Sequence, residues 1–454
     1  MSKPHKESEH HRKKHHPGDP TPPVTPPVTP PGGSGGTGSG SGGSGGGTPT
    51  PVSGQPVFGQ PTPSPDPTSF KDPVTDQSEP DVAGVLAVPQ PATSDAEPIL
   101  TLAQVYGSQG AAVTQTILNA GQIVFHSVGD TGSVEGPGTQ SLVADKMVSD
   151  FTEANAADVP SFYYHLGDVV YYFGESAYYY DQFFEPYRMY PAPILGVPGN
   201  HDGIVYPSDP EATLAGYLTN FCAATAAPSP DSGGLDRTTM IQPGVYYTFD
   251  APFVRILGLY SNVLEDPGVI SDQGGTYPTL DQRQVTFLTT ALARIKSEAY
   301  AGAVIIAVHH PPYTGGSEHG GSPLMLADID GACTAAGVWP HALLSGHAHN
   351  YQRFTRHWDG RQTPYVICGN GGHAHSSLTK KGAPALRTPA AQDLLSNGAD
   401  QVVFENYDDQ EYGYLRLLVN DTQLRIEYHP ASDGEAAKTP DDIVTVDLAA
   451  HTLA

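Results

Sequence analysis

Cysteine is nearly absent from this chain, with three among 454 residues. So small and odd a number argues against a disulfide framework, although one bridge and a free thiol remain compatible with it. No pair among Cys222, Cys333 and Cys368 has the spacing of a zinc knuckle. The chain also lacks an apolar run of about 18 residues, which argues against a membrane-spanning helix.

Basic residues are scarce as well. The chain has 22 Lys and Arg against 48 Asp and Glu, and its formal net charge is −26. Non-specific nucleic-acid binding needs Lys and Arg that face phosphates, so this composition excludes nucleic acid as a partner of the surface. An acidic protein that acts on anionic substrates must obtain local positive charge elsewhere, and metal ions are the obvious source.

Apolar residues are few in the N-terminal part. A His/Lys/Arg cluster, a Pro-Thr-Val segment and a Gly/Ser run follow one another there, and such composition cannot offset the entropy of ordering the chain. We predict a disordered tail over 1–95 and one catalytic domain over 96–454. No apolar segment follows the basic N-terminus, so it does not resemble a secretory signal. This favours a cytoplasmic location and leaves an extracytoplasmic one open.

The remaining residues predict an α/β domain. Near-continuous apolar runs indicate strands buried on both faces, and they occur at 123–125, 162–166, 194–197, 254–257, 303–308, 342–344 and 365–367. Apolar residues at helical spacing predict helices over 143–151 and 285–295, the second with a capping box formed by Thr279 and Gln282. An antiparallel hairpin is expected from 414–418 and 424–428 around Asn420 and Asp421.

Polar clusters directly follow five of these strands. They are Gly129-Asp130-Thr131-Gly132, Gly167-Asp168-Val169-Val170-Tyr171, Gly199-Asn200-His201-Asp202, Val308-His309-His310-Pro311 and Gly346-His347-Ala348-His349. Open α/β sheets bind ligands at the carboxyl ends of their strands. Each cluster alone is an ordinary turn or a structural histidine. Together they supply carboxylate, amide and imidazole groups that suit hard-to-borderline metal ions.

In this order, the clusters resemble the signature of the calcineurin-like metallophosphoesterase superfamily over residues 129–349. The resemblance implies a four-layer α/β/β/α sandwich of two mixed sheets. Many members have a histidine ligand where this chain has Gly132, whereas Tyr171 offers a replacement three residues after Asp168. This combination is similar to the purple acid phosphatase branch. Alternatives stay open: Tyr171 could line the core, and Tyr172 is easily confused with it.

The resemblance implies two metal ions bridged by Asp168. The ligands of the first would be Asp130, Asp168, Tyr171 and His349. The ligands of the second would be Asp168, Asn200, His309 and His347, with His310 as the alternative to His309. Fe(III) is expected at the Tyr171 site, and Fe(II), Zn(II) or Mn(II) at the second.

The expected activity is hydrolysis of small phosphomonoesters by in-line attack of a metal-bound hydroxide, as in acid phosphatases. His201 is the candidate general acid and His310 a second catalytic candidate, while Asp202 could orient His201 or cap the next segment. His373 could line the pocket, and the Gly-rich loop 315–321 could form its rim. Two alternatives are a phosphodiesterase for cyclic nucleotides or lipid headgroups, and an inactive module that binds metal or phosphate.

Overall fold

The computed structural model describes residues 54–59, 85–207, 209–316, 319–378 and 400–454. The three compositional segments of the predicted tail lie outside these ranges, as does Glu318 of the Gly-rich loop. Two stretches before residue 96 are described and contact the domain. The backbone N–H of Val57 donates to the Thr238 hydroxyl at 3.0 Å, and that of Leu86 donates to Asn262 Oδ1 at 3.2 Å.

One sheet has eight strands in the order β1-β5-β6-β7-β8-β10-β9-β11. Their bounds are β1 (Ile99–Thr101), β5 (Tyr247–Ala251), β6 (Val254–Leu259), β7 (Ala303–Val308), β8 (Ala342–Ser345), β9 (Tyr351–Trp358), β10 (Arg361–Cys368) and β11 (Asp400–Asp408). Strands β6, β7, β8 and β10 are parallel to their neighbours in this group. Every residue of β7 and β8 is buried, as the apolar runs predict.

The other sheet has seven strands in the order β15-β14-β13-β12-β2-β3-β4. Their bounds are β2 (Gln122–Val128), β3 (Tyr163–His165), β4 (Ile194–Gly196), β12 (Gly413–Asn420), β13 (Gln423–Pro430), β14 (Asp442–Asp447) and β15 (Thr452–Leu453). Strands β2, β3 and β4 are parallel, whereas β12 to β15 pair antiparallel. The predicted hairpin is confirmed as β12–β13, and Asn420 Oδ1 accepts from the backbone N–H groups of Thr422 and Gln423 within its turn.

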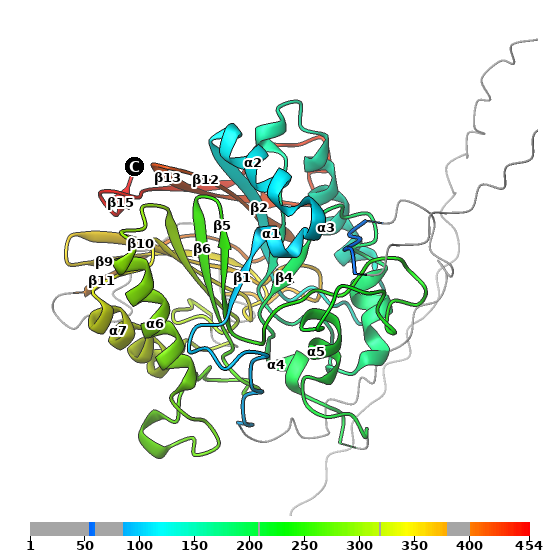
Figure 1. The fold of residues 1–454 in the computed structure, drawn as a ribbon, viewed down its shortest axis with the longest axis horizontal. Helices are drawn as coiled ribbons and strands as arrows, with labels where there is room; N and C mark the ends of the chain where they lie inside the picture. Colours follow the sequence, from blue (N-terminus) through cyan, green and yellow to red (C-terminus); the bar gives the residue numbers. More distant parts are fainter. Residues whose placement is uncertain (1–53, 60–84, 208, 317–318, 379–399) are drawn as a thin grey trace, which may run out of the picture. The chain divides into compact units, whose positions relative to one another are not determined.

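Helices cover the outer faces, so the domain has the expected four layers (Figure 1). Helix α6 (Arg283–Ser297) packs on α7 (Pro323–Ala336) and β6, while α2 (Gly110–Ala120) contacts β2 and α3 (Gly138–Ser149) contacts β12. The shorter helices are α1 (Leu102–Val105), α4 (Asn200–Gly203) and α5 (Ala215–Phe221). Single turns of other helix types are η1 (Gly107–Gln109), η2 (Asp150–Thr152), η3 (Ala156–Asp158), η4 (Ser176–Tyr178), η5 (Tyr180–Phe184) and η6 (Gln273–Gly275).

The predicted capping box of α6 is wrong. The helix begins only at Arg283, and Gln282 precedes it without a capping hydrogen bond from its side chain. The hydroxyl of Thr279 instead donates to the carbonyl of Val85 at 2.5 Å. A long-range contact thus takes the hydroxyl that the local pattern assigns to the helix. Both predicted helices otherwise form, although α3 ends at Ser149 and Phe151 lies in the turn η2.

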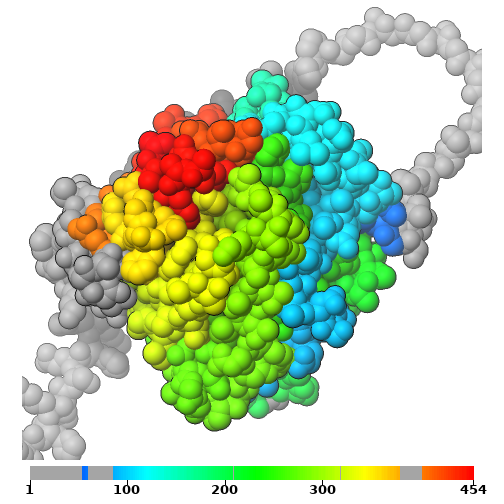
Figure 2. Space-filling view, turned by 60° about the vertical axis from the view of Figure 1, so that its left-hand side comes forward, coloured from blue at the N-terminus to red at the C-terminus, as the bar shows by residue number. Residues whose placement is uncertain are grey.

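The two sheets pack face to face through large apolar side chains. Phe162 beside β3 meets Phe249 of β5 edge to face, with ring centroids 5.0 Å apart, and both rings are fully buried. Each such ring stabilises the fold by about 1.5–3 kcal/mol through burial. The sheets also meet at one edge. The backbone N–H of Gln362 in β10 donates to the carbonyl of His451 at 3.0 Å, where yellow and red residues adjoin in Figure 2.

Two further findings bear on the sequence predictions. Cys222, Cys333 and Cys368 are all free thiols. Within the described ranges, the structure has no helix long and apolar enough to cross a membrane.

Candidate metal centre

All seven predicted ligands follow the carboxyl ends of parallel strands, six in loops and Asn200 at the start of α4. Asp130 follows β2, Asp168 and Tyr171 follow β3, and Asn200 follows β4, all in the seven-stranded sheet. The histidines follow strands of the eight-stranded sheet: His309 comes after β7, and His347 and His349 come after β8. The contacts below show that the packed sheets bring these loops together.

A first group gathers around the hydroxyl of Tyr171. This oxygen lies 3.0 Å from Asp130 Oδ1, 2.8 Å from Asp168 Oδ2 and 3.3 Å from His349 Nε2. His349 Nε2 is in turn 3.5 Å from Asp130 Oδ1. These are the four side chains that the resemblance assigns to the first metal. Tyr171 is fully buried, whereas Tyr172 is only partly buried.

A second group gathers around the amide oxygen of Asn200. Asn200 Oδ1 lies 3.0 Å from His309 Nε2 and 3.2 Å from His347 Nδ1. His309 Nε2 is also 3.2 Å from Asp168 Oδ2, so Asp168 belongs to both groups. Asp168, His309 and His347 each offer a ligand atom, all within 4.8 Å of one another. The two groups therefore match the two predicted ligand sets and share the predicted bridge.

The backbone at these positions is unusual. Asp130, Asp168 and His347 have φ angles of 57°, 55° and 68°, a left-handed backbone conformation that residues other than glycine rarely adopt. Such backbone conformations cost about 1–3 kcal/mol each and cluster at functional sites. The surrounding contacts that hold them include the carboxylate of Asp130, which accepts from the backbone N–H of His347 at 2.8 Å.

Asp202 ties two of the ligand loops together. Its carboxylate accepts the backbone N–H of Gly199 at 2.8 Å and those of Val169 and Val170 at 3.0 and 3.4 Å. These N–H groups all precede Asp202 in the chain, whereas the sequence suggested a cap of the next segment or a contact with His201. The contacts fix the loop of Asp168 relative to the loop of Asn200.

Position 132 has no room for a side chain. A Cβ atom on Gly132 would lie 2.3 Å from Gln182 Oε1 and 2.8 Å from the carbonyl of Val169. The side chain of Gln182 fills this space and binds the backbone of Tyr171. Gln182 Oε1 accepts from the Tyr171 N–H at 2.8 Å, and Gln182 Nε2 donates to the Tyr171 carbonyl at 2.7 Å. Gln182 thus occupies the space beside position 132 and also holds the backbone of Tyr171.

Electrostatics fit a pair of cations. Asp130 and Asp168 are buried, and in the described part of the chain their contacts are the Tyr171 hydroxyl, backbone N–H groups and histidines, not Lys or Arg. Burial alone would raise the pKa of Asp168, but the charges of His309 and His201 outweigh it and hold that pKa well below its usual range. Burial alone would lower the pKa of His309, but Asp168 and Asp130 raise it to about 9. Buried carboxylates need compensating charge, and the oxygen and imidazole donors here are suitable metal ligands.

The two predicted catalytic histidines are placed differently. His201 donates from Nδ1 to the carbonyl of Tyr172 at 2.7 Å, and its ring centroid is 4.4 Å from that of Tyr171. His310 is fully buried and uses both nitrogens elsewhere. Its Nδ1 accepts from the Ser261 hydroxyl at 2.7 Å, and its Nε2 donates to the carbonyl of Leu264 at 2.7 Å. Burial and the neighbouring His309 lower the pKa of His310 to about 3. Both nitrogens of His310 are thus engaged in this structure, and His309 is the imidazole nearest Asn200.

Three further side chains lie around the two groups. His373 stacks on Tyr171 with ring centroids 3.5 Å apart and donates from Nδ1 to the carbonyl of Gly132 at 2.9 Å. His319 comes from the predicted rim loop, and its ring centroid is 4.6 Å from that of His347. Glu265 accepts from Asn200 Nδ2 at 3.1 Å. Sequence reasoning missed Glu265, although its place in a loop after β6, beside β7, was a signal.

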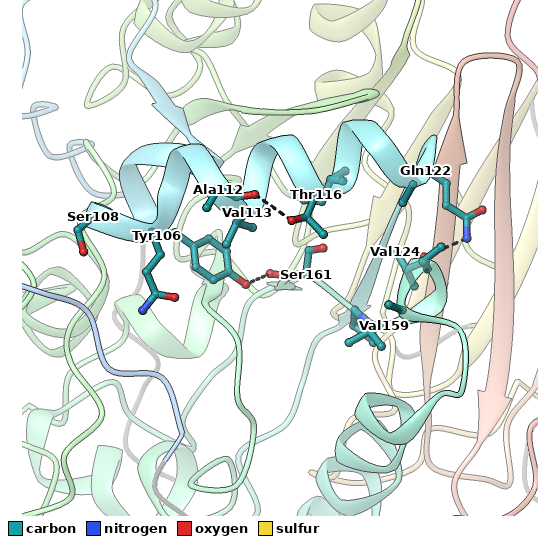
Figure 3. A pocket seen from close by; sticks show the side chains of 15 residues that line it. Tyr106, Ser108, Ala112, Val113, Thr116, Gln122, Val124, Val159 and Ser161 are labelled. Carbon is teal, nitrogen blue, oxygen red and sulfur yellow. Dashed lines mark hydrogen bonds between the residues drawn. The ribbon is translucent and has the colours of Figure 1, made fainter.

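A separate pocket of about 460 Å³ lies between α2 and the segment 156–161 (Figure 3). None of the predicted site residues lines it. Two of its polar side chains are already bonded: Tyr106 donates to the carbonyl of Ser161 at 2.6 Å, and Thr116 donates to that of Ala112 at 3.0 Å. We therefore assign no chemistry to this pocket.

A known protein family matches the part of the chain that carries the two ligand groups. Residues 128–351 match the family model of the calcineurin-like phosphoesterases, a span that includes all seven predicted ligands. No curated protein sequence matches the chain.

Several solved structures are distantly similar. Purple acid phosphatase PPD1 from yellow lupin has 16% identity and a TM-score of 0.44, covering 79% of this chain and 55% of that one. GAP50 from the inner membrane complex of Plasmodium has 12% identity and a TM-score of 0.47, covering 72% and 89%. A dimetal phosphatase from Danio rerio has 13% identity and a TM-score of 0.39, covering 72% and 99%. This chain thus spans only about half the length of the lupin protein. Over residues 128–351, just under half of its length, the chain thus matches the calcineurin-like phosphoesterase family.

Proposed function

We propose that this protein is a phosphomonoesterase of the acid phosphatase type, with two metal ions bridged by Asp168. The observation that carries the proposal is the pair of ligand groups that share this carboxylate, one around Tyr171 and one around Asn200. When bound, two cations would neutralise charge on the phosphate oxygens and lower the pKa of a water molecule toward neutrality.

The chain's own residues would position the ester and move the proton. His201 is the proposed general acid. Because a carbonyl oxygen only accepts, its contact with the Tyr172 carbonyl requires that Nδ1 carries a proton. This fixes the ring and leaves Nε2 to protonate the leaving oxygen of the ester. His319, whose ring centroid is 4.9 Å from that of His349, is proposed to contact the substrate at the entrance.

The proposed metal identities rest on Tyr171. A phenolate ligand favours Fe(III), with Fe(II), Zn(II) or Mn(II) in the second position. Purified, oxidised protein should contain about two metal ions per chain, and its iron–tyrosinate bond should absorb visible light. A colourless, iron-free but active enzyme would reject the iron assignment and leave the phosphoesterase proposal intact.

The relative activity on phosphomonoesters and phosphodiesters tests the proposed substrate class. We expect kcat/KM on an aryl phosphomonoester to exceed that on the matching diester at least about tenfold, and chelation to abolish both activities. Asp168→Asn should lower kcat by several orders of magnitude. Asp421→Asn is the matched control because Asp421 lies in the β12–β13 turn, at the end of the sheet where β2 begins. A preference for the diester would overturn the monoesterase assignment, and metal-loaded protein without turnover would indicate a binding module.

A further inference from the structure

The loop after β6 carries two consecutive carboxylates that face ligands of the second group. Glu265 Oε2 accepts from Asn200 Nδ2 at 3.1 Å. Asp266 Oδ1 lies 3.7 Å from His347 Nε2, a buried nitrogen without a hydrogen-bond partner in the described structure. Glu265 also forms an ion pair with His319, with Oε1 and Nδ1 3.4 Å apart. The predicted ligand sets include neither carboxylate.

The contact with Glu265 determines which way the Asn200 amide points. An amide has one accepting and one donating end, and a carboxylate can only accept. With Glu265 on one side, Nδ2 must face the carboxylate. Oδ1 must then face His309 and His347, where it lies 3.0 and 3.2 Å from their nitrogens. A flipped amide would present N–H groups to the cation position, which cannot coordinate a metal ion.

Another ligand of this group, His309, is anchored in a similar way. His309 donates from Nδ1 to the carbonyl of Leu166 at 2.8 Å, which directs Nε2 toward Asn200 and Asp168. His347 presents Nδ1 to Asn200, while its Nε2 lies 3.7 Å from Asp266, too far for a hydrogen bond. Partners on the far side of metal ligands commonly fix their orientation in this manner.

We propose that Glu265 is a positioning residue for the second metal, because it holds the Asn200 amide with its oxygen toward the cation. The inference rests on the proposed two-metal function. Glu265 also lies with His319 and His347 in a group whose ligand atoms are within 4.8 Å of one another, but its Oε2 contacts the amide nitrogen of Asn200, and its side chain is 45% exposed. Its replacement therefore changes the ligand's orientation without opening a cavity in the core. Loss of such an outer partner typically weakens metal binding about 10–100-fold.

The experiment is a Mn²⁺ titration of the metal-free full-length protein, with free Mn²⁺ followed by electron paramagnetic resonance. Mn²⁺ is preferred to Zn²⁺ because it binds imidazole less tightly, which limits binding at the N-terminal histidines. Glu265→Ala, which removes the acceptor opposite Asn200 Nδ2, should raise the Kd of the second Mn²⁺ by about 10–100-fold. The first Kd and the urea unfolding midpoint should stay unchanged. Asp421→Asn, which removes one carboxylate far along the sheet, is the matched control and should behave as the wild type.

Two further variants separate the direct contact from other causes. His319→Ala removes the other partner of Glu265, and we expect it to leave the second Kd within about threefold. Asn200→Asp places two carboxylates in contact, and neither can donate a hydrogen bond. Combining Asn200→Asp with Glu265→Gln restores a pair, because the new amide at 265 donates to the new carboxylate at 200. The double variant should therefore bind the second Mn²⁺ more tightly than Asn200→Asp alone.

The outcomes distinguish this inference from the proposed function. If the wild type binds two Mn²⁺ and Glu265→Ala binds both equally well, the positioning role is overturned and the two-metal function stands. The role is also overturned if His319→Ala reproduces the full loss, or if the double variant shows no recovery. If the wild type itself does not bind two metal ions, the proposed function fails first.

Discussion

Replacing Tyr171 with Phe tests the first ligand group at a single atom. The change removes one oxygen, which lies 2.8–3.3 Å from three other predicted ligands, and it keeps the ring that stacks on His373. Structural zinc sites of four ligands bind with about 10–16 kcal/mol in total, so an equal share for one ligand is about 3 kcal/mol. We therefore expect Tyr171→Phe to weaken the first metal about 100-fold.

Tyr172→Phe provides the matched control, because it removes the same atom from the neighbouring residue. The assay is competition of each variant with a chelator for the first metal, together with the visible spectrum of the iron form. Tyr171→Phe should lose both affinity and colour, whereas Tyr172→Phe should keep them. Equal affinity and colour in wild type and Tyr171→Phe would refute the assignment of this hydroxyl as a ligand, and colour loss only in Tyr172→Phe would shift it to the neighbour.

Two further predictions concern the proton donor and acid stability. His201→Asn should lower kcat by about 10²–10⁴-fold for alkyl esters, whose leaving oxygen needs a proton, and far less for aryl esters with acidic phenols; equal losses on both would contradict the general-acid role. Glu427 contacts Arg425, Arg416 and His429, and these partners outweigh burial and lower its pKa from 4.5 to about 2. A carboxyl group whose pKa is lower in the folded than in the unfolded chain stabilises the fold at pH values above its unfolded pKa. Glu427 therefore contributes about 3 kcal/mol to the free energy of unfolding at pH 7, and this contribution is lost as the pH falls from 4.5 toward 2. In urea unfolding, Glu427→Gln should be less stable than wild type at pH 7, and the difference should shrink at pH 3; a difference that is constant with pH would contradict the assignment.

The strands and the ligand loops could be predicted because their signals are local. The run of β7 is apolar at every position, and His309 follows it directly. Features that depend on distant partners could not be predicted. Glu265 meets Asn200 across 65 positions of sequence, and the nitrogens of His310 are occupied by Ser261 and Leu264, more than 40 positions away. Likewise, the hydroxyl of Thr279 bonds to Val85 rather than to its own helix.

The two sheets supply different chemistry to the candidate centre, since one contributes the oxygen ligands and the other the imidazoles. Neither layer alone can therefore complete a coordination sphere. A slip of one layer by a single strand residue, about 3.3 Å, exceeds a metal–nitrogen bond of about 2.1 Å and would leave any cation half-ligated. Metal affinity would thus measure how accurately the layers are aligned, and a substitution deep between them could impair the centre without touching a ligand.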